Sequence, residues 1–171
     1  MYKRAGLIMD LAVHKLDLVL TDRPMPPMRN VSAYNHLLGE SGLTFFSSRA
    51  SSATYRHAFP QCLDDAPFLY PTPSTALRSA LEAWFRNVGV TPRAVGEFED
   101  AALMSAFGEA GDGIFALPTT IEDDVMHTHG VEAIGRTLEV KQRFYAVSTE
   151  RRLKHPSVVA ITDAARMRLF S

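Results

Sequence analysis

The segment Arg93–Pro118, RAVGEFEDAALMSAFGEAGDGIFALP, has the pattern of a strand, a helix and a second strand. Residues 94–98 are typical of a strand, and residues 101–109 are strong helix formers. Asp100 precedes the helical run, where its carboxylate can accept hydrogen bonds from free N–H groups of the first turn. The helical spacing predicts that three apolar side chains share one face: Leu103, Met104 and Phe107.

The second half of this segment predicts a buried strand. Gly111 and Gly113 end the helix, Ile114–Leu117 is wholly apolar, and Pro118 closes the run. A short apolar strand of this kind is typical of a parallel sheet that is covered on both faces. Such βαβ units place functional groups at the carboxyl ends of the strands, beside the N-termini of helices.

Composition indicates an ordinary globular protein. The chain has 171 residues, 46% of them hydrophobic and 22% charged, with a formal net charge of -1. The densest basic cluster is Arg151, Arg152 and Lys154, which we interpret as a solvated corner and not as a nucleic-acid site. A single cysteine, Cys62, fits a reducing compartment. With no secretory leader and no apolar run long enough for a membrane span, we expect a cytoplasmic protein that does not enter a membrane.

The remaining pattern alternates helices and strands, which predicts an α/β protein. We expect helices at 2–15, 49–57, 76–87 and 157–169, a short helix capped by Thr119 or Thr120, and strands at 16–20, 31–38, 43–48, 68–70, 131–134 and 140–148. A turn at 39–42 should separate the second and third strands. The chain should therefore leave one lobe, build a second, and return to the first.

Polar side chains follow two of the expected strands. Thr72, Ser74 and Thr75 stand between a strand and a long helix, where they either bind a polar or anionic ligand or only cap the helix. Glu99 and Asp100, with Glu97 before them, suit a hard cation, although capping and solvation account for them as well.

No constellation in the sequence indicates catalysis. His127 and His129 would point apart on a strand or a helix, and His57 and Cys62 resemble a Cys/His dyad by composition only. A nucleophile elbow, a phosphate-binding loop and a dinucleotide fingerprint are all missing from the sequence. We therefore expect a binding protein and not an enzyme, with no cofactor and no metal site.

Three stretches together resemble the effector-binding domain of LysR-type transcriptional regulators: Leu16–Pro24, Gly111–Pro118, and the tail from Phe144–Val147 through His155–Ser157 to Phe170. Their order and spacing carry the resemblance, which covers essentially the whole chain. Within the family, residues 36–43 and 68–81 are most similar to the members that regulate sodium/proton antiporter genes.

The resemblance implies an α/β fold of two Rossmann-like lobes of the type 2 periplasmic-binding-protein kind, with a small molecule or ion as effector in the cleft. We expect an incomplete lobe I from residues 1–42 and 144–171, and lobe II from residues 43–143. The resemblance also implies a homo-oligomer, a dimer or tetramer in full-length form. DNA would be bound only through a helix-turn-helix domain absent from this chain.

Carried over residue by residue, the family's effector contacts fall on strand ends and on the hinge of lobe I. They are Thr21, Asp22, Arg23, Thr72, Ser74, Thr75, Phe98, Glu99, Asp100, Leu117 and Pro118. Two alternatives stay open. A solute-binding protein of a transporter shares the fold, and the effector is either an ion such as sodium or an organic acid.

Overall fold

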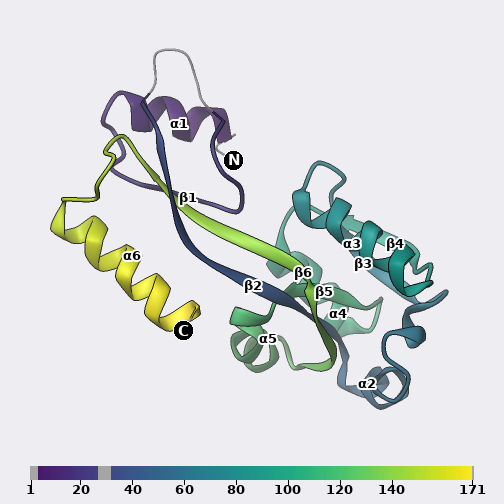
Figure 1. Cartoon of the computed structure of the whole chain (residues 1–171). Helices are drawn as coiled ribbons and strands as arrows, with labels where there is room; N and C mark the ends of the chain where they lie inside the picture. The colour runs from purple at the N-terminus through teal and green to yellow at the C-terminus, as the bar shows by residue number, and fades with distance from the viewer. Residues whose placement is uncertain (1–3, 27–31, 171) are drawn as a thin grey trace. The chain divides into compact units, whose positions relative to one another are not determined.

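The computed structural model describes residues 4–26 and 32–170, and the chain divides into two compact units (Figure 1). Unit 1 consists of Met1–Glu40 and Arg143–Ser171, and unit 2 consists of Ser41–Gln142. The chain enters unit 2 within strand β2 and returns to unit 1 within strand β6.

Helices and strands alternate along most of the chain. The helices are α1 (Arg4–Ala12), α2 (Arg49–Arg56), α3 (Ala76–Val88), α4 (Ala101–Ala110), α5 (Glu122–His129) and α6 (Pro156–Leu169), with short 3₁₀ turns at Gln61–Leu63 and Thr119–Ile121. The strands are β1 (Val19–Thr21), β2 (Tyr34–Ser48), β3 (Pro67–Pro71), β4 (Arg93–Phe98), β5 (Phe115–Pro118) and β6 (Val131–Ser148).

Hydrogen bonds order four strands as β1-β6-β2-β5, and β3 pairs in parallel with β4. β1 pairs with the unit 1 part of β6, where Val19 faces Val147, and β5 pairs with the unit 2 part of β2. A parallel bridge joins Phe68 of β3 to Ile114, just before β5. The strand, helix and strand expected over Arg93–Pro118 are thus present as β4, α4 and β5.

The core of unit 2 lies on both faces of its strands because neighbouring side chains point to opposite sides. Phe45 of β2 and Phe68 of β3 belong to an aromatic cluster with α3, which contributes Trp84 and Phe85. On the other face, β2, β3 and β5 pack with α4 and α5 in a second cluster that contains Phe46. Two covered faces explain why β5 is apolar throughout.

Unit 1 has a smaller core, built by α1, β1 and the end of β6. Leu11 of α1 is fully buried and packs with Val19 and Val147. Met25 also joins this cluster, and its backbone N–H and C=O both pair with the side-chain amide of Asn35, at 2.7 and 3.0 Å. The segment after β1 is thereby tied to β2.

The expectation of two strands with a turn at 39–42 is wrong, because β2 is one uninterrupted strand of 15 residues (Figure 1). Its two glycines serve close packing. A Cβ built on Gly39 would lie 2.2 Å from the Phe170 ring, and one on Gly42 would lie 2.6 Å from the Thr137 carbonyl oxygen. Glycine within a strand often marks such a close approach and not a turn. The start of the expected strand, Val31, lies outside the described residues.

The two strands expected at 131–134 and 140–148 are likewise one strand, β6, with 18 residues. The polar residues between the two ranges interrupt the apolar pattern, and this interruption predicted a break in the strand. Arg136, Leu138 and Glu139 are exposed, but the strand continues through them beside β2.

The helix ends of unit 2 match the sequence signals in part. Gly111 ends α4 in the left-handed conformation, with φ of 93°, as glycine permits. Of the three residues expected on the inner face of α4, Met104 is buried, whereas Leu103 and Phe107 are 53% and 44% exposed. The threonine cap expected before residue 126 is wrong, because α5 begins at Glu122 with no side-chain cap.

Candidate functional site

The carboxyl ends of β3 and β4 lie side by side in unit 2. The backbone N–H of Thr72, directly after β3, donates to the carbonyl oxygen of Phe98 at the end of β4, at 3.0 Å. Glu99 and Asp100 follow Phe98 and are exposed. The structure therefore brings two of the predicted groups of site residues together at one edge, as a parallel pair of strands requires.

The three hydroxyl groups at the start of α3 make different hydrogen bonds. Thr75 Oγ1 accepts from the N–H of Arg78 at 3.2 Å and donates to the carbonyl oxygen of Thr72 at 2.9 Å, so this hydroxyl is an N-cap. Thr72 Oγ1 and Ser74 Oγ lie 3.5 Å apart on an exposed turn. Capping thus accounts for Thr75, while Thr72 and Ser74 present hydroxyl groups beside the strand ends.

Asp100 is the corresponding cap of α4, since its Oδ1 accepts from the N–H of Leu103 at 2.8 Å. The neighbouring Phe98 ring packs against Phe107 of α4, with 5.2 Å between the ring centroids. Glu99 neither caps a helix, as Asp100 does, nor packs against α4, as Phe98 does. Of the three residues predicted here, Glu99 presents the carboxylate that no helix cap explains.

One cation stands at this edge, and two carboxylates neutralise it. The Arg78 guanidinium lies 3.9 Å from the centre of the Tyr70 ring, and its side chain is only 14% exposed. It donates to the Pro71 carbonyl oxygen at 3.2 Å, to Glu97 at 2.9 Å and to Glu82. Together with Glu99 and Asp100, these carboxylates leave the strand ends net negative. The charge favours a neutral or cationic ligand over an organic anion.

Leu117 and Pro118 are buried, so their side chains serve packing. Their backbone pairs with β2, Leu117 opposite Thr44 and Pro118 opposite Leu43. Directly after them, the N–H of Thr120 donates to Ser41 Oγ at 3.2 Å. The strand end is therefore held firmly, and any contact of Leu117 or Pro118 with a ligand involves the backbone.

The remaining predicted residues, Thr21, Asp22 and Arg23, form a turn in unit 1. Thr21 Oγ1 donates to the Arg23 carbonyl oxygen at 3.2 Å and accepts from the Arg23 N–H at 3.4 Å. The Arg23 guanidinium lies 3.8 Å from the Asp22 carboxylate. This turn follows β1 directly, as expected for a strand-end group.

The sequence gives no sign of a buried polar network beside β5. Glu122 of α5 accepts from Thr44 of β2 at 2.6 Å and from Arg136 of β6, whose Nε and Nη2 donate to the two carboxylate oxygens. The hydrogen bonds from Arg136, helped by Thr44 and opposed by burial, hold the pKa of Glu122 below its ordinary value. The partners lie 78 and 14 residues away in sequence, so no local pattern could reveal them.

The described residues contain neither a metal-binding cluster nor a membrane-spanning helix. In residues 4–26 and 32–170, no three side chains of His, Cys, Asp or Glu are arranged to hold a metal ion. Over the same ranges, no helix combines the length and apolar character needed to cross a bilayer.

Comparison with known families gives one match over nearly the whole chain. A model described as the LysR substrate binding domain matches residues 3–169. The chain is also 33% identical over 165 residues to the transcriptional activator protein NhaR of Escherichia coli (strain K12), and equally to NhaR of Shigella flexneri. These matches cover 96% of this chain and 54% of each relative, so the chain spans about half the length of the curated relatives.

Solved structures share the fold at low sequence identity. CbnR, a LysR family transcriptional regulator, matches with a TM-score of 0.74 and 14% identity over 96% of this chain and 56% of that chain. The effector-binding domain of QuiR in complex with shikimate matches with a TM-score of 0.66 and 18% identity over 97% and 78% of the two chains. The BenM effector-binding domain with benzoate matches with a TM-score of 0.69 and 12% identity over 97% and 75%. The α/β fold of the type 2 periplasmic-binding-protein kind, expected from the sequence, is thereby confirmed.

Proposed function

The chain belongs to the LysR substrate-binding domain family, and we propose that it senses a small molecule or ion and so controls transcription by the regulator that contains it. The family consists of regulatory domains and not of enzymes, in agreement with the sequence analysis. The relatives named NhaR are transcriptional activators, which supports activation as the mode of control. By the same relationship, we propose a sodium/proton antiporter gene as the target.

The observation that carries this proposal is the paired strand ends of β3 and β4. Thr72 and Phe98 are hydrogen-bonded neighbours there, next to the N-termini of α3 and α4. The other predicted contacts, including Leu117, Pro118 and the turn Thr21–Arg23, are part of the same proposal. Unit 1 and unit 2 would correspond to lobes I and II of the family fold.

The charge at the strand ends supports an ion or an uncharged molecule as the effector. Glu97, Glu99 and Asp100 stand against the single guanidinium of Arg78. Carboxylate and hydroxyl oxygens are suitable partners for hard cations, and the carboxylates repel organic acids. Sodium is therefore the first candidate, and shikimate and benzoate, which bind QuiR and BenM, are the comparison ligands.

The proposed site predicts a selective loss of binding. Thr72→Val and Ser74→Ala should each weaken effector binding about tenfold, or ~1.4 kcal/mol, because each removes a hydroxyl beside the strand ends. Thr75→Ser keeps the cap of α3 and should change neither binding nor stability. Isothermal titration with sodium chloride, shikimate and benzoate at constant ionic strength measures the affinities. Equal affinities in all variants would show that these hydroxyls only shape the turn.

We also propose that the regulator is a cytoplasmic homo-oligomer. DNA would be contacted by a part of it outside these 171 residues, consistent with the net charge of -1. β1 is the end strand in the order β1-β6-β2-β5, and Leu20 on it is 58% exposed. An apolar edge strand is a template for pairing with a second copy of the chain.

Self-association through this edge is open to a direct test. Leu20→Lys should shift the chain toward monomer in sedimentation velocity, because a lysine on an edge strand opposes strand pairing. The matched control is Leu138→Lys. It changes an exposed leucine that lies in unit 2, away from β1 in sequence and outside the proposed edge, so it should leave the association unchanged. A wild-type chain that stays monomeric at high concentration would contradict this part of the proposal.

A further inference from the structure

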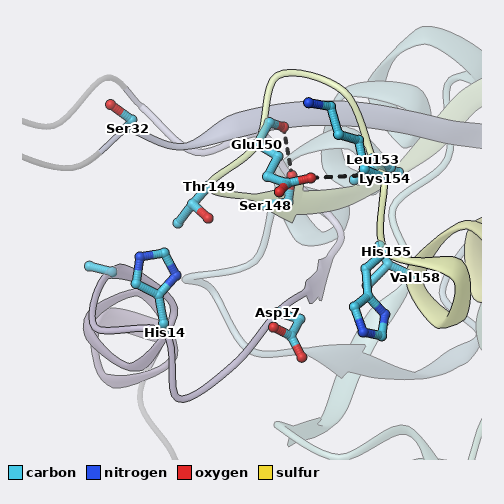
Figure 2. Close-up of a pocket in the computed structure, with 11 residues that line it drawn as sticks. His14, Asp17, Ser32, Ser148, Thr149, Glu150, Leu153, Lys154, His155 and Val158 are labelled. Atoms are coloured by element: carbon cyan, nitrogen blue, oxygen red, sulfur yellow. Dashed lines mark hydrogen bonds between the residues drawn. The ribbon is translucent and has the colours of Figure 1, made fainter.

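Unit 1 contains a pocket of about 480 Å³, which is lined by the end of α1, the loop before β1, the end of β6 and the start of α6 (Figure 2). In Figure 2 the Asp17 carboxylate lies between the imidazoles of His14 and His155. Glu150 and Lys154 also line the pocket, so one cation stands against two carboxylates. All five side chains are exposed, and exposed charges interact weakly. The charges around this pocket are therefore solvated and select no ligand.

Arg78 in unit 2 is, in contrast, a mostly buried cation at a helix position that disfavours one. It lies in the first turn of α3, three residues after the N-cap Thr75, and that turn contains no acidic residue. The partial positive charge of a helix N-terminus disfavours a cation there. The Arg78 side chain is nevertheless only 14% exposed, so little water compensates for its charge. Its partners must therefore come from outside the first turn.

Two strands and α3 itself supply these partners. Through Nη1 the guanidinium donates to the Pro71 carbonyl oxygen of β3 at 3.2 Å and to the Glu97 carboxylate of β4 at 2.9 Å. Through Nε it donates to Glu82, one turn further along α3. The Tyr70 ring packs against the guanidinium, with 3.9 Å between Cζ and the ring centre. One side chain thus joins α3 to the ends of both β3 and β4.

A proline limits the backbone pairing at these strand ends. Pro71 faces Phe98 in the parallel register, and it has no N–H to donate to β4. The next backbone bond runs from the Thr72 N–H to the Phe98 carbonyl oxygen, at 3.0 Å. The two residues that Arg78 joins across the strands, Pro71 and Glu97, come directly before Thr72 and Phe98. Arg78 therefore supplies a cross-strand link at the point where the backbone pairing is weakest.

We propose that Arg78 is a positioning residue of the effector site, which holds the ends of β3 and β4 together. The hydroxyls of Thr72 and Ser74 follow one of these ends, and the carboxylate of Glu99 follows the other, so the link made by Arg78 sets the distance between them. By pairing with Glu97, Arg78 also leaves Glu99 as the carboxylate for the effector. This inference rests on the proposed function, because it assigns a role within the same site.

The two carboxylates on Arg78 distinguish this role from local packing. Glu97 reaches the guanidinium from β4, whereas Glu82 reaches it from α3, so only Glu97 links the helix to the end of β4. The two side chains are similarly exposed, at 47% for Glu97 and 43% for Glu82. Glu97→Gln and Glu82→Gln each remove one negative charge beside the same cation. They are therefore a matched pair that differs in the segment released.

Amide hydrogen exchange tests the link between the strand ends without any ligand. In Arg78→Met and in Glu97→Gln, the Thr72 N–H should exchange about tenfold faster than in the wild type, because the strand ends separate more often. The rate is taken relative to the Leu69 N–H, which is hydrogen-bonded further back in β3 at 2.8 Å and reports general destabilisation. Methionine keeps an apolar stem at position 78. Glu82→Gln should leave the relative rate unchanged.

Isothermal titration with sodium chloride, shikimate and benzoate, at constant ionic strength, tests the effect on the site. For each probe that binds the wild type, Arg78→Met and Glu97→Gln should both weaken binding about tenfold, whereas Glu82→Gln should bind like the wild type. Charge alone predicts something else, because the first two variants change the net charge in opposite directions. The double variant should bind no more weakly than Arg78→Met, since both changes break one link.

The results separate this inference from the proposed function. Unchanged exchange of the Thr72 N–H in both Arg78→Met and Glu97→Gln overturns the inference. Affinity changes of opposite sign in these two variants also overturn it, because charge and not position would then govern binding. Failure of all three probes to bind the wild type contradicts the proposed function instead. Hydrogen exchange then still decides by itself whether Arg78 holds the strand ends together.

Discussion

Replacing Phe45 by alanine should lower the free energy of unfolding by about 4 kcal/mol, because it opens a cavity at the centre of the unit 2 core. Phe45 is fully buried. Its ring lies 5.2 Å from those of both Phe59 and Trp84, 6.2 Å from that of Phe68 and 6.3 Å from that of Phe85. No neighbour can fill the space without losing its own contacts.

Urea denaturation followed by Trp84 fluorescence measures this loss. The matched control is Leu138→Ala, since Leu138 is 75% exposed and should cost less than about 0.5 kcal/mol. If Phe45→Ala cost no more than this control, the aromatic cluster between β2, β3 and α3 would not be the core of unit 2.

Replacing Glu122 by glutamine should cost about 2 kcal/mol at neutral pH, because it removes a charged partner of Arg136 and weakens the bond from Thr44. The Glu122 side chain is only 9% exposed, whereas Arg136 is 61% exposed. Water therefore reaches the guanidinium after the change and limits the cost. The expected loss is smaller than for a fully buried ion pair.

The pH dependence of this loss has a definite sign. The folded-state pKa of Glu122 lies below the ordinary value of 4.5, so folding favours the carboxylate. Its contribution is fully present above that value and disappears as the pH falls through the folded-state pKa. The stabilities of the wild type and Glu122→Gln should therefore converge in acid. Glu139→Gln, at an exposed position of β6, should show no such convergence, and a difference for Glu122→Gln that stayed constant to low pH would contradict the assignment.

The sequence predicted those parts of the fold that depend on local signals. The unit from β4 to β5 was readable because helix formers, a capping Asp100, a terminal glycine and an apolar strand all agree within 26 residues. The long strands β2 and β6 were not readable. Gly39 and Gly42 were interpreted as a turn, whereas they allow Phe170 and the Thr137 backbone to approach.

For the candidate site too, the sequence predicted only those features that depend on local signals. Thr75 and Asp100 were recognised as residues that begin helices, and both are caps in the structure. The polar network around Glu122 depends on partners that only the fold brings together, so no spacing rule could find it. The pocket of unit 1 was missed for a related reason. Its two histidines lie 141 positions apart, and each looks unremarkable in its own surroundings.

The most direct test of the central claim is amide chemical-shift mapping of the ¹⁵N-labelled chain. The chain is titrated with sodium chloride, shikimate and benzoate in turn, with choline chloride keeping the ionic strength constant in the sodium series. The account predicts that at least one of these ligands produces saturable shifts in the amides of Thr72, Ser74 and Thr75 and of residues 98–100 together, at the ends of β3 and β4. Saturable shifts confined to other residues, or no saturable shift with any of the three, would contradict it.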